Sequence, residues 1–200
     1  MLSIIGFILV FLLSFVLNLI PFAGPSNMFI AAWAVIITGL GNADSTSLLI
    51  IGIIVALGAT LAKGIHYGAT FFIGKRLNEK KFVKFETNAT RVKKWAFLLL
   101  YVAAATPIPD EPIVITLGLM KYSITKFFIS YFLGKLSIAV LGAFMGNIMG
   151  GAVSEWLSPT MMLISMAIMS AVLTILMVVI MFKVDLDKLA YRLMGKSQST

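Results

Sequence analysis

The segment Thr106-Pro107-Ile108-Pro109-Asp110-Glu111-Pro112 decides how this chain folds. Its prolines lack a backbone donor and clash with the preceding helical turn, so no helix continues through all of them. Apolar sequence flanks the segment, from Trp95 to Ala105 and from Ile113 to Met120. Each flank is shorter than the roughly 20 residues that cross a bilayer. We therefore predict a re-entrant helical hairpin, residues 95–120, that enters a membrane and returns on the same side.

The composition of the whole chain indicates an integral membrane protein. Of its 200 residues, 60% are hydrophobic and 12% are charged. A soluble domain of this length has too little interior to bury so much apolar surface. We expect a single membrane domain, residues 1–200, in which the apolar residues 2–20 form a retained segment and not a signal peptide.

The same sequence carries no pattern typical of an enzyme. There is no cysteine, and His66 is the one histidine, so a metal cluster built on either residue type is excluded. Neither a nucleophile motif nor a phosphate-binding loop is present. We expect no catalytic residue, no metal and no cofactor, and we predict that the protein is not an enzyme.

Prolines also interrupt the first apolar stretch, which predicts a second re-entrant hairpin at residues 1–40. Here the break is Pro21-Phe22-Ala23-Gly24-Pro25. The other predicted segments are listed here in chain order: a transmembrane helix at 48–74, a basic interfacial linker at 75–94, the hairpin at 95–120, transmembrane helices at 127–151 and 160–182, and a tail at 183–200.

The basic residues predict the topology. Eight of the 16 lie between Lys75 and Lys94, and four more lie in the tail. Basic residues beside spans mark the cytoplasmic side and contact anionic lipid. We therefore place the linker and the C-terminus in the cytoplasm, with anionic head groups at 75–94 as partners and no nucleic acid. Lys121 and Lys126 place the other end of the 95–120 hairpin on that side too.

Residues 1–40 and the turn at 38–47 contain no lysine or arginine, so the first hairpin enters from the opposite side. The predicted fold is therefore an all-α polytopic membrane protein. Each half is a re-entrant hairpin followed by a transmembrane helix, the halves form an inverted repeat, and an additional C-terminal transmembrane helix follows. Gly142, Gly146 and Gly150 share one helix face, which permits close contact. Internal packing and a homo-oligomer are both open uses of that face. We expect Glu155 and Trp156 in the next turn.

The two hairpin tips are expected to meet near the middle of the membrane. Non-helical backbone is tolerated there only inside protein or beside a water-filled cavity, and free helix ends offer N–H groups to phosphate or carboxylate. The residues expected to bind substrate or couple its movement are Ser26, Asn27, Thr106, Asp110 and Glu111 from the breaks, and Lys63, His66 and Lys135 from the spans. The breaks themselves are made by Pro21, Pro25, Pro107, Pro109 and Pro112.

Several roles stay open for these residues. Asp110 or Glu111 is expected to pair with a cation or carry a proton, although one of them could instead cap the following helix. Lys63 is too deep to snorkel, which favours an anion anchor or a partner for a carboxylate. His66 is either a proton relay or a packing residue. Lys135 lies close enough to Lys126 to snorkel to the cytoplasmic surface, and otherwise joins the site.

At these residues the chain resembles the DedA family of the VTT (SNARE-associated Golgi protein) superfamily. The resemblance rests on the first proline-rich break, the basic linker and the following residues: Gly58-Ala59, Lys63, Tyr67, Gly74-Lys75, Pro107-Ile108-Pro109-Asp110, Gly118, Phe127-Phe128 and Gly134. It implies two opposed re-entrant hairpins, a prokaryotic cell membrane, and movement of lipids between leaflets. Lys63 stands where many members have an acid, and Asp110 or Glu111 where many have arginine. This exchange predicts a swapped ion pair between Lys63 and one of the two carboxylates.

The function that we expect is a lipid transporter or scramblase. It would move a phospholipid or a polyprenyl-phosphate lipid between leaflets, with or without proton coupling. One alternative is a proton- or cation-coupled exporter of small amphiphilic molecules that uses the same cavity. A second alternative is a membrane-embedded lipid-modifying enzyme or a scaffold.

Overall fold

The computed structural model describes residues 4–21, 24–38, 44–76, 95–107 and 110–156, together with residues 158, 160, 161, 164, 165, 168, 172 and 175. In this part of the chain all regular structure is helical. Several predicted features lie outside the described residues. They are most of the linker 75–94, most of the span 160–182, the tail 183–200, and Pro109.

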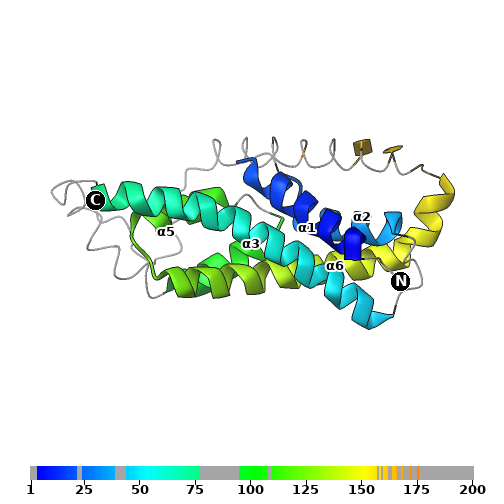
Figure 1. Cartoon of the computed structure of the whole chain (residues 1–200), viewed down its shortest axis with the longest axis horizontal. Helices are drawn as coiled ribbons and strands as arrows, with labels where there is room; N and C mark the ends of the chain where they lie inside the picture. The colour runs from blue at the N-terminus through cyan, green and yellow to red at the C-terminus, as the bar shows by residue number, and fades with distance from the viewer. Residues whose placement is uncertain are drawn as a thin grey trace, which may run out of the picture.

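Two long helices cross each other and form the frame of the molecule (Figure 1). They are α3, Ser45–Arg76, and α6, Ile124–Trp156. All of α3, and α6 as far as Gly150, is long and apolar enough to cross a membrane. The two helices run in opposite directions, since Gly52 of α3 lies against Val140 of α6 and Gly64 lies against Phe128.

Both long helices extend beyond the predicted spans. Lys75 and Arg76 form the last turn of α3 and do not belong to a separate linker. There the C-terminal carbonyls and the helix dipole favour a positive charge. Glu155 and Trp156 complete α6, so the prediction that they form the next turn is wrong. Asp44 immediately precedes α3, and the Ser47 hydroxyl in the first turn of α3 donates to Asp44 Oδ1 at 2.7 Å and lowers the pKa of this exposed carboxyl.

Four shorter helices pack on this frame, and each pair is interrupted at a predicted break. The first pair is α1, Ile4–Leu19, and α2, Asn27–Ile37. The second pair is the helix Trp95–Ala105 and α5, Glu111–Leu119. Pro112 was predicted to belong to the second break, but it lies in the first turn of α5. A proline is tolerated there because the N–H groups of the first turn have no partner within the helix.

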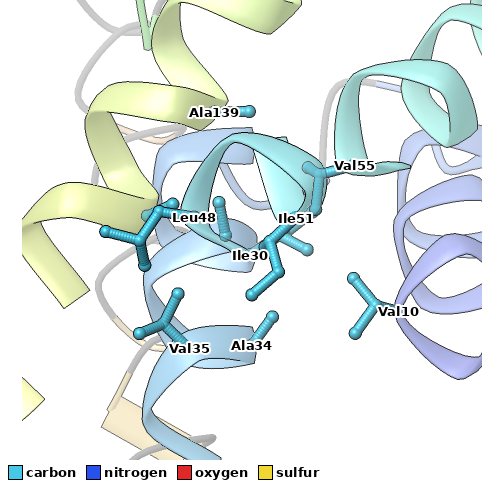
Figure 2. Close-up of a cluster of buried hydrophobic side chains, with 10 residues drawn as sticks. Val10, Ile30, Ala34, Val35, Leu48, Ile51, Val55 and Ala139 are labelled. Carbon is cyan, nitrogen blue, oxygen red and sulfur yellow. The ribbon is translucent and has the colours of Figure 1, made fainter. Parts of the chain in front are cut away.

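The first pair divides between the two long helices. α1 packs along α3, where the Ser14 hydroxyl donates to Val55 O at 2.7 Å. α2 packs along α6, where a side chain on Gly142 or Gly146 would collide with the backbone of Met28 or Ala32. The buried cluster in Figure 2 joins the four helices, with contributions from Val10 of α1, Ile30 and Val35 of α2, Ile51 and Val55 of α3, and Ala139 of α6.

The second pair divides in the same way. The helix Trp95–Ala105 lies along α6, and the Ser130 hydroxyl donates to Phe97 O at 2.5 Å. α5 lies along α3, where Gly74 is packed against Leu119. A second buried cluster fills this side, and in it the rings of Tyr67, Phe127 and Tyr131 are stacked. The first helix of each pair therefore packs on the next long helix in the chain, and the second packs on the other long helix.

The glycine face of α6 has an internal use. Gly142 and Gly146 are covered by the backbone of α2, which approaches closely because neither glycine has a side chain. Of the two uses that the sequence left open, the structure assigns these glycines to packing within the chain. A homo-oligomer would have to use a different surface.

Candidate functional site

The candidate site surrounds the N-terminus of α5, where the second break ends. Asp110 occupies the N-cap position and Glu111 is the first helical residue. The two residues are only 3% and 5% exposed. The break thus delivers two adjacent carboxylates into the interior, which is costly for charged groups unless they are paired.

Two lysines from the long helices meet these carboxylates. Lys63 of α3 contacts Glu111 Oε1 directly, and its Nζ lies 3.8 Å from Asp110 Oδ1. Lys135 of α6 places its Nζ 2.7 Å from Asp110 Oδ2. The Tyr131 hydroxyl donates to the same oxygen at 2.6 Å. We call these five residues the charge cluster.

The charge cluster balances itself. Both lysines are buried, and the two ammonium groups face two carboxylates, so the formal charge of the four ions is zero. Asp110 is the centre, because it receives two lysines and a tyrosine, whereas Glu111 is bonded to Lys63. Any change to one of the four ions leaves a buried charge without compensation.

The geometry of the charge cluster tests three predictions made from the sequence. The swapped ion pair is present, with Glu111 as the direct partner of Lys63 and Asp110 farther away. The prediction that Lys135 snorkels to the cytoplasmic surface is wrong, since Asp110 provides a buried partner. Capping of α5 by a carboxylate is also wrong, because Asp110 makes no side-chain cap bond and turns to Lys135 and Tyr131 instead.

The first break is held by uncharged groups. Asn18 Nδ2 donates to Ser14 O and to Asn27 Oδ1, both at 2.8 Å, and so connects the last turn of α1 to the start of α2. His66 Nε2 lies 3.1 Å from Leu19 O, the end of α1. His66 is one turn after Lys63 on α3, so consecutive turns of α3 reach the two breaks.

Besides Asn27 and His66, two predicted site residues make no hydrogen bond to the charge cluster in the part of the chain that the structure describes. The Ser26 hydroxyl caps α2 by accepting from Met28 N at 3.4 Å. The Thr106 hydroxyl donates to Ala103 O at 3.1 Å and so closes the preceding helix. Among the break prolines, Pro21 and Pro107 are exposed. The predicted set therefore separates into a charge cluster at the second break, an amide group at the first, and helix caps.

Sequence reasoning missed Tyr131, Asn18 and Ser14. Tyr131 lies four residues before Lys135, a spacing that puts both side chains on one helix face. Asn18 and Ser14 are polar residues within an apolar helix and share a face by the same rule. That spacing could have identified all three. Within the described ranges, no group of three or more His, Asp or Glu side chains is placed to hold a metal ion.

Comparisons with protein-family models, with curated proteins and with solved structures each found no match to this chain.

Proposed function

We propose that this protein spans a prokaryotic cell membrane and moves a lipid, either a phospholipid or a polyprenyl phosphate, between the two leaflets. The observation that carries the proposal is the buried charge cluster at the tip of the second break. It gathers two lysines and two carboxylates in the middle of an apolar helical frame. Ionisable groups at such a depth are costly and mark pathways for ions or polar head groups.

The exposed surface of α3 supports a membrane location. An apolar residue is exposed every fourth position along one stripe, at Leu49, Ile53, Leu57, Leu61 and Ile65, each between 40% and 53% exposed. Phe72 continues the stripe. From Leu49 to Phe72 a helix rises about 35 Å, which matches a hydrocarbon core of about 30 Å. Lipid chains are the solvent that suits this surface.

The packing of the short helices supports two re-entrant hairpins. α5 ends against Gly74, near the cytoplasmic end proposed for α3, while its start reaches Lys63 in the middle. The helix Trp95–Ala105 starts near the beginning of α6, since Phe97 meets Ser130. Both ends of this pair thus lie at one end of the frame. α1 and α2 lie toward the opposite end, near the start of α3 (Figure 1). In each pair the first helix packs on the next long helix in the chain and the second packs on the other long helix, an arrangement that two inverted halves would share.

The charge cluster suits a phosphate-bearing head group. Lysine ammonium groups bind phosphate as point charges, and Lys63 and Lys135 can exchange a carboxylate for a phosphate oxygen. Glu111 and Asp110 would then take a proton or a cation from the substrate. The DedA resemblance, in which Lys63 and Asp110 exchange the charges common at their positions, supports the same activity. In this proposal the basic linker and the C-terminus face the cytoplasm.

Lipid translocation in proteoliposomes tests the proposal. NBD-phospholipid reduction by dithionite and polyprenyl-phosphate accessibility would be measured for the wild type and for Asp110→Asn/Glu111→Gln. We expect the double variant to lose about tenfold or more in rate, which corresponds to about 1.4 kcal/mol. Lys63→Met/Glu111→Gln keeps the buried charge at zero and provides a variant less prone to misfold. Asp44→Asn, which neutralises an exposed carboxylate, is the control.

The alternatives predict different results. Folded wild-type protein that moves neither lipid would contradict lipid translocation and favour the exporter of small amphiphiles, to be tested by uptake driven by a proton gradient. Turnover of labelled lipid without movement would indicate a lipid-modifying enzyme. A scaffold would tolerate neutralisation of Asp110 and Glu111 together.

A further inference from the structure

The two breaks start their second helices in similar ways but with different chemistry. Asn27 is the first residue of α2, as Glu111 is the first residue of α5, and each follows an N-cap residue. The N-terminus of a helix carries a partial positive charge. At α5 the chain supplies its own anions, Asp110 and Glu111. At α2 it supplies none, since the first turn holds no acidic residue.

Asn27 has a buried donor that finds no hydrogen-bond partner among the described residues. The residue is 1% exposed. Its Oδ1 accepts from Asn18, but its Nδ2 has no hydrogen-bond partner in the part of the chain that the structure describes. An unmade hydrogen bond of this kind costs stability, so it calls for an explanation. A ligand that accepts a hydrogen bond is one.

The position of the amide points to that ligand. Asn18 belongs to the last turn of α1, so the bond to Asn27 Oδ1 holds the amide between the end of α1 and the start of α2. The free Nδ2 therefore lies at the N-terminus of α2, where the helix dipole favours an anion. Phe29 N and Ile30 N already donate to Ser26 O, at 2.9 and 3.2 Å, so the side-chain amide is the donor that the site offers. The Ser26 cap bond is long, at 3.4 Å, and can yield to a stronger acceptor.

We propose that the N-terminus of α2, with Asn27 Nδ2, binds an oxyanion of the phosphate class. The proposed function supplies one source, the phosphate of a lipid head group, and free phosphate is the other. The ligand enters when the last turn of α1 parts from α2. That movement breaks the Asn18–Asn27 bond and shifts Leu17, which packs against the first buried cluster, but it leaves most helix contacts in place, because α1 packs mainly on α3 and α2 mainly on α6.

The test uses full-length protein in dodecyl maltoside and two probes, inorganic phosphate and dihexanoyl-phosphatidylglycerol below its micelle concentration. A ligand that binds the folded state raises the thermal unfolding midpoint, by an amount that grows with the logarithm of its concentration divided by its dissociation constant. Asn27→Leu should weaken affinity about tenfold or more by removing the donor, and Asn27→Asp should abolish binding by repulsion. Trp33→Phe is the matched control, since Trp33 Nε1 is another buried, unpartnered N–H of α2, and it should change affinity less than about twofold.

The outcomes separate the two sources and the two proposals. Binding of either probe that depends on Asn27 supports the site, and the probe that binds identifies the source. The site is overturned if neither probe shifts the wild type, or if Asn27→Leu, shown to be folded by size exclusion, binds as the wild type does. Because this assay needs no translocation, binding at Asn27 without lipid movement would retain the site and reject the proposed function. Lipid movement by a protein whose phosphate binding does not change in Asn27→Leu would retain the proposed function and reject the site.

Discussion

Tyr131 of α6 and Asp110 at the start of α5 are joined by a buried hydrogen bond, in which the hydroxyl donates to Asp110 Oδ2 at 2.6 Å. Tyr131 is fully buried, so no water can replace this donor without a structural change. The bond orients the carboxylate that also receives Lys135. Two different donors of α6 thereby hold Asp110 Oδ2, while Lys63 of α3 lies 3.8 Å from Asp110 Oδ1.

Tyr131→Phe should therefore destabilise the protein. A hydrogen bond to a charged group contributes about 1.5–3 kcal/mol, and the substitution deletes the donor while preserving the ring stack with Phe127. Thermal unfolding in detergent would measure the loss. Tyr101→Phe is the control, since the Tyr101 hydroxyl pairs with Ser137 at 3.1 Å at an exposed position and should contribute little. Equal losses of stability in the two variants would show that the buried hydrogen bond to Asp110 contributes no more than the exposed one.

Charge balance predicts that a second substitution repairs the first. Lys63→Met leaves the charge cluster with one uncompensated negative charge, and breaking a buried pair costs about 3–5 kcal/mol. Lys63→Met/Glu111→Gln returns the charge to zero and should recover much of that stability. Unfolding of both variants, with exposed Lys121→Met as the control, would measure it. A double variant no more stable than Lys63→Met would mean that Glu111 is not the energetic partner of Lys63.

Gly58 and Gly134 should show similar sensitivity to an added side chain. A Cβ on Gly58 would lie 2.7 Å from Phe11 O of α1, and a Cβ on Gly134 would lie 2.6 Å from Tyr101 O. Each contact is to backbone, which cannot rotate away. We expect Gly58→Val and Gly134→Val each to cost about 1–3 kcal/mol or more in stability.

Gly68→Ala is the control for both glycines, because nothing lies within 4 Å of its Cβ position. It should be neutral or stabilising, since alanine favours helix more than glycine does. Unfolding midpoints of the three variants would be compared. A tolerated Gly58→Val or Gly134→Val would show that the short helix can move off its long helix.

The cysteine-free sequence allows a direct test of topology. In the proposed arrangement Lys75→Cys and Lys121→Cys lie on the cytoplasmic side, one before and one after the 95–120 hairpin, while Asp44→Cys lies outside. All three positions are exposed. An impermeant thiol reagent should label Asp44→Cys in intact cells and the other two only after permeabilisation. Opposite accessibility of the Lys75 and Lys121 variants would show that the hairpin crosses the membrane.

Much of the helical arrangement was predictable because its causes are local. Prolines end helices wherever they occur outside a first turn, and both breaks lie where the sequence placed them. The long apolar stretches predicted α3 and α6. The errors are confined to the positions where these helices start and end, because a helix continues for as long as its last turns make favourable contacts. The burial of Lys63 also followed from its distance to the basic end of α3.

Partners were less predictable, because they depend on distances through space. Whether Lys135 snorkels or pairs depends on the position of Asp110, which α5 supplies from another part of the chain. Tyr131 was missed for the same reason, although its spacing from Lys135 could have identified it. The glycine face of α6 could have met a second copy, and only the packing of α2 against Gly142 and Gly146 assigned it.

The sequence by itself determined where the helices break and that the chain is rich in apolar surface, since backbone sterics and side-chain hydropathy act along the chain. Tertiary structure alone decided that two lysines share Asp110, that Glu111 takes Lys63, and that Asn27 keeps an unpartnered donor. Ion pairs and hydrogen bonds form only over about 2.5–4 Å, and such distances are set when separate helices pack together.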